Sequence, residues 1–225
     1  MAKEIDAKRY ISEGLEMFKA NTNILVVLTI AFFVISAIPV VFPPIAVILT
    51  GPLTGALFLA IMDLNAGEQL DPKKLGESVV AKIVPLILAG IAVFFLTGLG
   101  FILVIPGILL TGWYLFTFLF ILDRDMDFWA AMEASRQVAF ENQVGMFVFA
   151  LFLILINLVG AILLGIGLLV SVPVTACATF KAYQDVVGLA NDPKTSIGTG
   201  GKVMTSKPQM KVSAATPPPP PPKKK

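Results

Sequence analysis

The side chains that carry out most enzymatic and metal chemistry are nearly absent from this chain. Among its 225 residues there is no histidine, and Cys177 is the single cysteine. This composition excludes His/Cys metal sites, catalysis by a cysteine or serine paired with histidine, and an intramolecular disulfide. The net charge of +2 is too small to indicate nucleic-acid binding. We therefore expect a non-enzymatic protein without a metal or cofactor.

Among the polar side chains that lie inside the long apolar stretches, the amide of Asn157 is the strongest hydrogen-bonding group. Its amide can form a hydrogen bond between two helices, a contact worth about 0.6–2 kcal/mol in a membrane. We favour this packing role over a role in ligand binding. The serines and threonines of the same stretches can bond to the preceding helical turn. No ionisable residue lies in these stretches, which argues against a proton- or ion-coupled transporter.

Charged residues are confined to four segments, and the gaps between them define the fold. Residues 20–62, 83–122 and 142–180 contain no Asp, Glu, Lys or Arg. One bilayer crossing needs about 20 apolar residues, so each gap has room for two crossings and almost no loop. Helix-breaking residues lie near the middle of each gap: Pro39, Pro43 and Pro44, then Gly98, Gly100, Pro106 and Gly107, then Gly160, Gly165 and Gly167.

These gaps predict an all-α membrane protein with six transmembrane helices arranged as three hairpins. We place an amphipathic segment at 1–22 and the membrane domain at 23–190. The expected hairpins are 23–62, 83–122 and 144–182. The return helices are expected to start at Thr50, Thr111 and Ser171, with spacings of 61 and 60 residues. This spacing favours an internal repeat, although six spans of similar length would also produce it.

Small residues within the hairpins predict where helices pack closely. Gly51 and Gly55 form a GxxxG pair, and Ala161 and Gly165 have the same spacing. Gly160 is a further packing candidate. Such spacing allows close contact within one chain or between two, so a homo-oligomer is one interpretation.

The segments between the hairpins read as amphipathic helices. Asp71 precedes Pro72 in an arrangement typical of a helix start, and Asp127 is a second candidate N-cap. We expect these helices to lie at the bilayer surface, with Trp113, Trp129 and Tyr183 as interfacial anchors. Periodicity alone equally allows cytoplasmic extensions of the spans that pack on each other.

The distribution of basic residues predicts the orientation. All 17 Lys and Arg lie in the four charged segments, four before residue 20, three in 63–82, two in 123–141 and eight from 181 onward. Two crossings per hairpin place these segments on one side, which the positive-inside rule makes cytoplasmic. Both termini are therefore expected in the cytoplasm.

The tail at 191–225 has a different composition, rich in Gly, Ser, Thr, Lys and Pro, and is expected to be disordered. It ends in six prolines (217–222) and three lysines (223–225). We interpret these as a stiff spacer with weak attraction to anionic lipid. A cytoplasmic partner that binds the polyproline stretch is the alternative.

The segment from Ile105 to Tyr183 resembles a widespread family of uncharacterised bacterial multi-pass proteins, similar to the membrane domain fused to some glycerophosphodiester phosphodiesterases. The resemblance implies a six-span inner-membrane protein without a catalytic domain, and it carries no common activity. The matching pieces are Ile105-Pro106-Gly107, Trp113-Tyr114, Asp123-Arg124-Asp125, Phe128-Trp129-Ala130-Ala131, Ser135, Asn157-Leu158-Val159-Gly160, Gly165-Ile166-Gly167, Pro173 and Ala182-Tyr183.

Two functions fit these features. The first is a membrane scaffold or bilayer-organising protein, because the turns at 40–45 and 100–105 contain no polar side chain. Turns this apolar would let the hairpins act as wedges inserted from the cytoplasmic side. The alternative is a permease or channel for a small uncharged solute between the repeats.

Overall fold

The computed structural model describes residues 5–37, 43–162 and 166–190. In that part of the chain the fold is all-helical, and no strand occurs. The expected disordered tail lies outside the described residues. The helices are α1 (Ala7–Ala20), α2 (Thr22–Ala37), α3 (Pro43–Asn65), α4 (Pro72–Ala81), α5 (Ile83–Phe101), α6 (Ile105–Trp113), α7 (Thr117–Arg124), α8 (Phe128–Glu141), α9 (Gln143–Ile162) and α10 (Leu168–Val186).

The helices follow one another in three groups of similar order. Each group has a short helix (α1, α4 or α8), a break of one residue, a long apolar helix (α2, α5 or α9) and a return helix (α3, α6 with α7, or α10). The breaks fall at Asn21, Lys82 and Asn142. We call these groups unit 1, unit 2 and unit 3.

The three breaks share one backbone arrangement. The carbonyl oxygens of Asn21, Lys82 and Asn142 each accept a hydrogen bond from the amide four residues later, at 3.0, 3.1 and 2.9 Å. The next helix therefore begins directly after the single break residue. Between α1 and α2 the chain axis turns by 96°.

The predicted N-caps of two short helices are confirmed. The carboxylate of Asp71 accepts a hydrogen bond from the Lys73 amide at the start of α4. Asp127 accepts from the amides of Trp129 and Ala130 at the start of α8. These caps satisfy amides that have no partner inside the helix.

The return helices start earlier than the sequence predicted. They begin at Pro43, Ile105 and Leu168 rather than at Thr50, Thr111 and Ser171. Proline lacks an amide hydrogen and is tolerated in the first helical turn, so Pro43 and Pro106 lie inside helices that they were expected to precede.

Four stretches of the described residues are long and apolar enough to cross a membrane: Val47–Asn65, Ile83–Phe101, Ile105–Arg124 and Gln143–Ile162. The bent pair α1 and α2 would make a fifth. The sequence predicted six. The described part of α2 has 16 residues. α10 carries Lys181, Gln184 and Asp185 in its last two turns. Six spans therefore remain a prediction.

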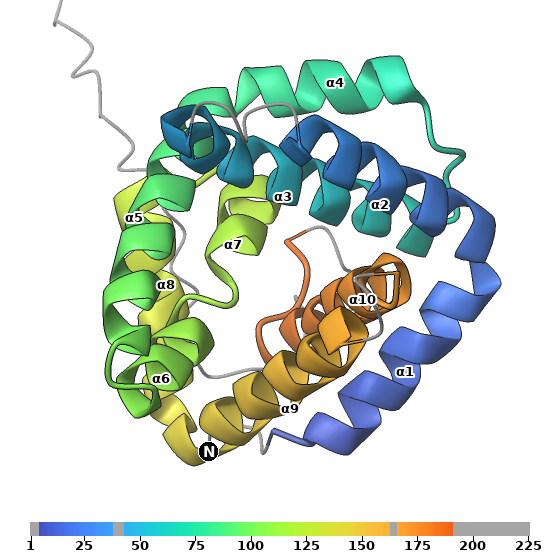
Figure 1. Cartoon of the computed structure of the whole chain (residues 1–225). Helices are drawn as coiled ribbons and strands as arrows, with labels where there is room; N and C mark the ends of the chain where they lie inside the picture. Colours follow the sequence, from blue (N-terminus) through green and yellow to red (C-terminus); the bar gives the residue numbers. More distant parts are fainter. Residues whose placement is uncertain (1–4, 38–42, 163–165, 191–225) are drawn as a thin grey trace, which may run out of the picture.

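The three units pack in a closed ring. The return helix α3 packs on α5, α6 packs on α9, and α10 packs on α2, so each return helix meets the long helix of another unit. Each short helix likewise packs on the return helix of another unit, with α4 on α3, α8 on α7 and α1 on α10. In Figure 1 α1, α4, α5 and α9 lie on the outside, and α3, α7 and α10 lie toward the centre.

Glycine allows the closest of these contacts. A β-carbon on Gly51 of α3 would overlap the carbonyl oxygen of Leu86 and lie 3.3 Å from the Cα atom of Gly90, both on α5. Gly112 of α6 lies similarly against α9, where a β-carbon would be 3.2 Å from the Met146 carbonyl oxygen. The backbones of neighbouring units thus touch at these positions.

Replacing Gly51 with alanine should destabilise the protein by about 1–3 kcal/mol, because the added methyl group overpacks a contact between two backbones. Gly98 of α5 is the matched control, since a β-carbon there would have nothing within 4 Å. Gly98→Ala should be neutral or stabilise by up to about 1 kcal/mol through helix propensity. Thermal unfolding in detergent micelles measures both. Equal unfolding temperatures for the two variants would contradict the packing argument.

Candidate functional site

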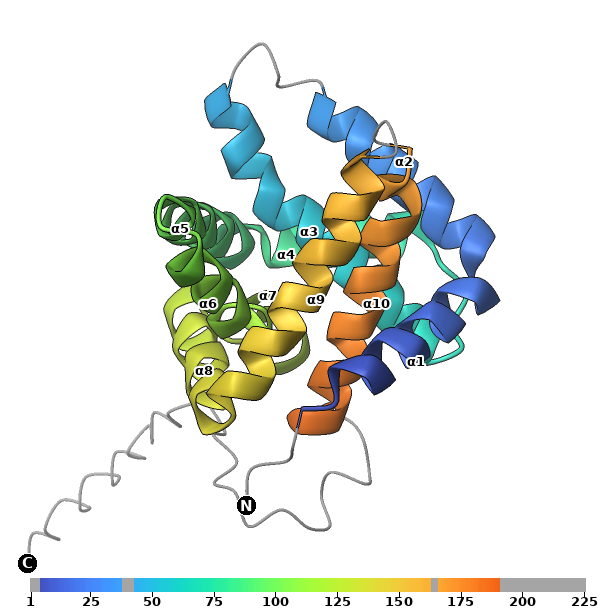
Figure 2. The same cartoon turned by 60° about the horizontal axis from the view of Figure 1, so that its bottom comes forward.

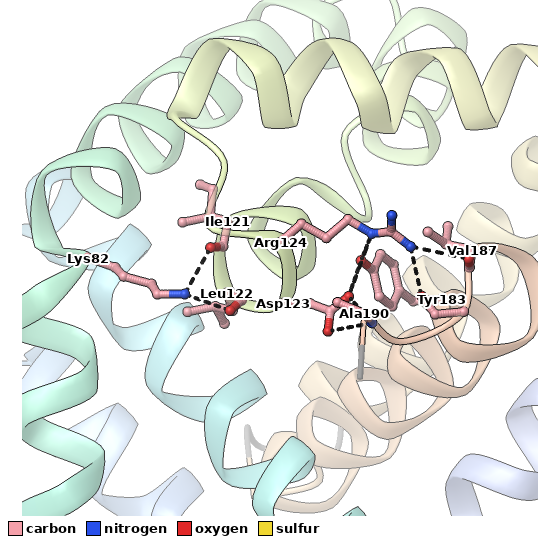
Figure 3. Close-up of polar contacts among 9 residues, drawn as sticks. Lys82, Ile121, Leu122, Asp123, Arg124, Tyr183, Val187 and Ala190 are labelled. Atoms are coloured by element: carbon pink, nitrogen blue, oxygen red, sulfur yellow. Dashed lines mark hydrogen bonds and ion pairs between the residues drawn. The ribbon is translucent and has the colours of Figure 1, made fainter. Parts of the chain in front are cut away.

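A set of polar contacts lies where the return helices end, and we call it the polar base. Figure 3 shows its central part. The Lys82 ammonium donates to the carbonyl oxygens of Leu122 and Ile121 in the last turn of α7, at 2.6 and 3.3 Å. It also pairs with the Asp125 carboxylate at 2.8 Å.

Two more cations serve the other return helices. Arg124 donates to the carbonyl oxygens of Gly188 and Val187, just beyond α10, at 3.1 and 3.4 Å. Lys181 donates to the side-chain oxygen of Asn65, the last residue of α3, at 2.8 Å. The last carbonyls of a helix lack internal partners and form the negative end of its dipole. Each return helix therefore ends against a cation from another element.

Asp123 is the most enclosed charge of the base, with 5% of its side chain exposed. Its carboxylate accepts hydrogen bonds from the Tyr183 hydroxyl at 2.9 Å and from the Ala190 amide at 3.1 Å. The Arg124 guanidinium lies 3.7 Å away and donates to the Tyr183 hydroxyl at 3.4 Å. These contacts fix α7 to the C-terminal end of α10 (Figure 3).

A second Tyr–Asp–Arg group holds the opposite side of α10. Asp185 accepts a hydrogen bond from the Tyr10 hydroxyl at 2.7 Å and pairs with Arg9. Burial and the neighbouring Asp185 carboxylate raise the pKa of Tyr10 to about 12. Figure 2 shows α1 lying across this end of α10. The last turns of α10 are thus held between α1 and α7.

Asn157 lies between α9 and α10. Its amide donates to the Thr175 hydroxyl at 3.1 Å, and its carbonyl oxygen accepts from the Ser171 hydroxyl at 3.0 Å. Both partners are on α10, so the amide connects two antiparallel helices inside an apolar region. This is the geometry that interhelical packing requires.

The glycines predicted to pack helices lie in different settings. Gly51 meets α5 backbone to backbone, and a β-carbon on Gly55 would lie 2.9 Å from the Leu86 side chain. Gly160 lies against Ser171 and Gly167 near the start of α10. Gly165 is outside the described residues. The three described glycines all meet neighbours within the chain, so these contacts require no second copy.

The three predicted anchors differ in exposure. Trp129 on α8 is 68% exposed, as an interfacial residue would be. Trp113 is half-buried, and its ring packs on Phe140 with centroids 4.8 Å apart. Tyr183 has no exposed surface, because its ring packs between Phe116 and Phe120. Its side chain is therefore enclosed by the protein, and its role as an interfacial anchor stays a prediction.

The break between α6 and α7 was not predicted. Ser135 of α8 bridges it, since its hydroxyl accepts from the Phe116 amide at 3.1 Å and donates to the Trp113 carbonyl at 2.7 Å. A serine side chain thus replaces a backbone partner that the interrupted helix lacks. The sequence gives no local signal for this break, because residues 113–117 contain neither glycine nor proline.

The charged groups of the polar base are occupied in capping helices and pairing with each other. Among the described residues, no three His, Cys, Asp or Glu side chains converge as metal ligands. One surface hollow of about 400 Å³ lies between the start of α1 and α9, lined in part by Ile5 and Phe152. Another of about 290 Å³ lies between α5 and the α7–α8 connection, near Leu88. Both open on the outside of the ring.

Comparisons with known proteins returned nothing: no family model matches the chain, and searches of curated proteins and of solved structures found no match.

Replacing Tyr183 with phenylalanine should destabilise the protein by about 1–3 kcal/mol, because a buried carboxylate loses a hydrogen-bond donor. Tyr114→Phe is the matched control, since Tyr114 is only half-buried on the α6–α7 connection. Differential scanning fluorimetry in detergent gives the two unfolding temperatures. A loss no larger for Tyr183→Phe than for Tyr114→Phe would argue against a role for Tyr183 in fixing α7 to the end of α10.

Stability should also fall as the pH rises from about 10 to about 12. The folded pKa of Tyr10 lies above its ordinary value of 10.0, so the protonated hydroxyl is favoured by folding. Its contribution is complete below pH 10 and lost as the pH passes the folded pKa. Tyr10→Phe should show a shallower alkaline loss in urea unfolding experiments. Identical pH profiles for the two proteins would refute the linkage.

Proposed function

We propose that this chain is a non-enzymatic integral membrane protein, a scaffold that organises the bilayer through helical hairpins and interfacial helices. Its principal partner is the lipid bilayer, and the bacterial inner membrane is the proposed location, with both termini cytoplasmic. The resemblance to uncharacterised multi-pass proteins fits this proposal and adds no activity to it.

The observation that carries the proposal is the apolar outer surface of the ring. Val84 and Val144 occupy the same place in units 2 and 3, two residues after the break, and are 62% and 76% exposed. Further along the same helices, Leu99 and Ile162 are also exposed. An apolar surface this large is stable only against lipid or another apolar partner.

The short helices support placement at the bilayer surface. Each is followed, after a break of one residue, by a long apolar helix, so it lies at the boundary between polar and apolar regions. Trp129 of α8 faces outward there, and the neighbouring Arg136 holds the pKa of Glu133 at about 2. Aromatic rings beside paired charges are typical of an interfacial helix.

The proposal retains six membrane-embedded helices in three repeats. α10 is polar for a span, yet most of its residues are buried by other helices. A helix enclosed by protein needs no apolar outer surface, so polar residues such as Thr175 and Thr179 are tolerated. The equivalent breaks at Asn21, Lys82 and Asn142 and the ring of contacts support descent of the units from one helical hairpin.

The scaffold is preferred over a permease because the α10 hydroxyls that could line a path, those of Ser171, Thr175 and Thr179, are already bonded. The Thr175 hydroxyl donates to the Ser171 carbonyl oxygen, and the Thr179 hydroxyl donates to the Thr175 carbonyl oxygen at 2.8 Å. The two surface hollows described above lie outside the ring. A polyproline-binding partner and a homo-oligomer remain secondary proposals.

Reconstitution tests the scaffold directly. Liposomes containing the purified chain should become smaller and more curved as the protein-to-lipid ratio rises, with no release of trapped neutral solutes. Trp129→Ala should weaken this effect, because the exposed indole supplies interfacial contact. Lys73→Ala, at another exposed position, is the control. Unchanged vesicle size combined with solute release would favour the permease.

A further inference from the structure

We infer that the α5–α6 turn ends inside the hydrocarbon of the leaflet opposite the polar base and contacts acyl chains rather than water. This inference rests on the proposed function and deepens it, because it assigns one hairpin a depth and a contact partner. The turn comprises Phe101–Ile105, which we call the tip.

The side chains of the tip are apolar and point away from the rest of the protein. Ile102, Leu103, Val104 and Ile105 are 59–76% exposed. Surface loops in water usually contain residues that hydrogen-bond to solvent, and this one contains none. Four consecutive large apolar side chains exposed at a turn are stable when lipid surrounds them.

The backbone of the tip meets the requirement that a lipid environment imposes. The amides of Ile102, Leu103 and Val104 donate to carbonyl oxygens three residues earlier, at 3.3, 3.1 and 3.1 Å. The Ile105 amide donates to the Leu103 carbonyl at 2.7 Å, and Pro106 has no amide hydrogen. A turn in hydrocarbon has no water to satisfy its amides, so internal bonding of this kind is needed there.

This internal bonding requires a strained residue. Val104 has φ of 57° and ψ of −66°, a conformation that β-branched residues rarely adopt. It is the centre of a γ-turn closed by the Ile105–Leu103 hydrogen bond, a strained form of that turn. In water the chain could relax by turning an amide to solvent. In hydrocarbon no solvent is available to the amide, so the backbone cannot relax in this way. A lipid environment therefore accounts for a strained backbone at an exposed position.

The reach of α5 agrees with this depth. The helix starts directly after Lys82, whose ammonium belongs to the polar base. Its 19 residues extend about 28 Å at 1.5 Å per residue. The hydrocarbon core is about 30 Å thick, so even an untilted α5 brings the tip only to the far boundary. Any tilt leaves the tip inside.

Fluorescence quenching in liposomes tests the depth of the tip. In a Cys177→Ala background, a single cysteine at Leu103 carries an environment-sensitive fluorophore, and a cysteine at Lys73 is the exposed control on α4. We expect lipids with nitroxide-labelled acyl chains to quench the Leu103 probe several-fold more than aqueous iodide does, with the reverse at Lys73. Iodide quenching at Leu103 equal to that at Lys73 would overturn the inference.

A second pair of variants guards against a probe that perturbs the turn. With the fluorophore at Ile102, Leu103→Lys should reduce acyl-chain quenching because an ammonium group is disfavoured in hydrocarbon. Leu103→Ala should preserve it. The same quenching pattern in both variants would also contradict the inference. If the tip proves accessible to iodide while the protein still increases vesicle curvature, this inference fails alone and the scaffold proposal stands.

Discussion

The architecture depends on how the C-terminal ends of the return helices are satisfied. The C-terminal end of each return helix is the negative end of its dipole, and its last carbonyl groups have no partner inside the regular helix. Lys82 and Arg124 each donate to carbonyl oxygens at such an end from another element, and Lys181 donates to the side chain of Asn65, the last residue of α3. A cation held by several carbonyl or amide oxygens neutralises the helix dipole and fixes the position of the helix it came from. The same contacts therefore stabilise the negative helix ends and hold the units together.

The apolar contacts complete what the charges position. Gly51 against Gly90, and Gly112 against Met146, bring backbones together between neighbouring units. In lipid, helix association gains little from the hydrophobic effect and relies on close packing and hydrogen bonds. The glycines allow the close packing, and Asn157 forms hydrogen bonds with two partners on α10.

Local signals predicted much of this fold, and long-range contacts account for what they missed. Charge-free gaps located the long apolar helices, and Asp71 and Asp127 identified helix starts because a cap involves only neighbouring residues. Tyr183 was predicted as an interfacial anchor, whereas its side chain is fully buried and bonded to Asp123, which lies 60 residues away in the sequence. The α6–α7 break likewise depends on Ser135, which belongs to the following helix. Sequence patterns within one segment do not identify partners that lie in another segment.

The ring has a consequence for synthesis at the ribosome. α1 and α2 are made before the other described helices, yet their main partner from another unit is α10, the last of the described helices. Until α10 arrives, Tyr10 lacks the Asp185 carboxylate that it contacts in the finished protein. Units 1 and 2 can pack together once α5 is present, and unit 3 can then pack on unit 2. The ring of contacts is complete only when α10 packs on α1 and α2. The surface that α1 and α2 present to α10 thus stays uncovered until α10 has been made.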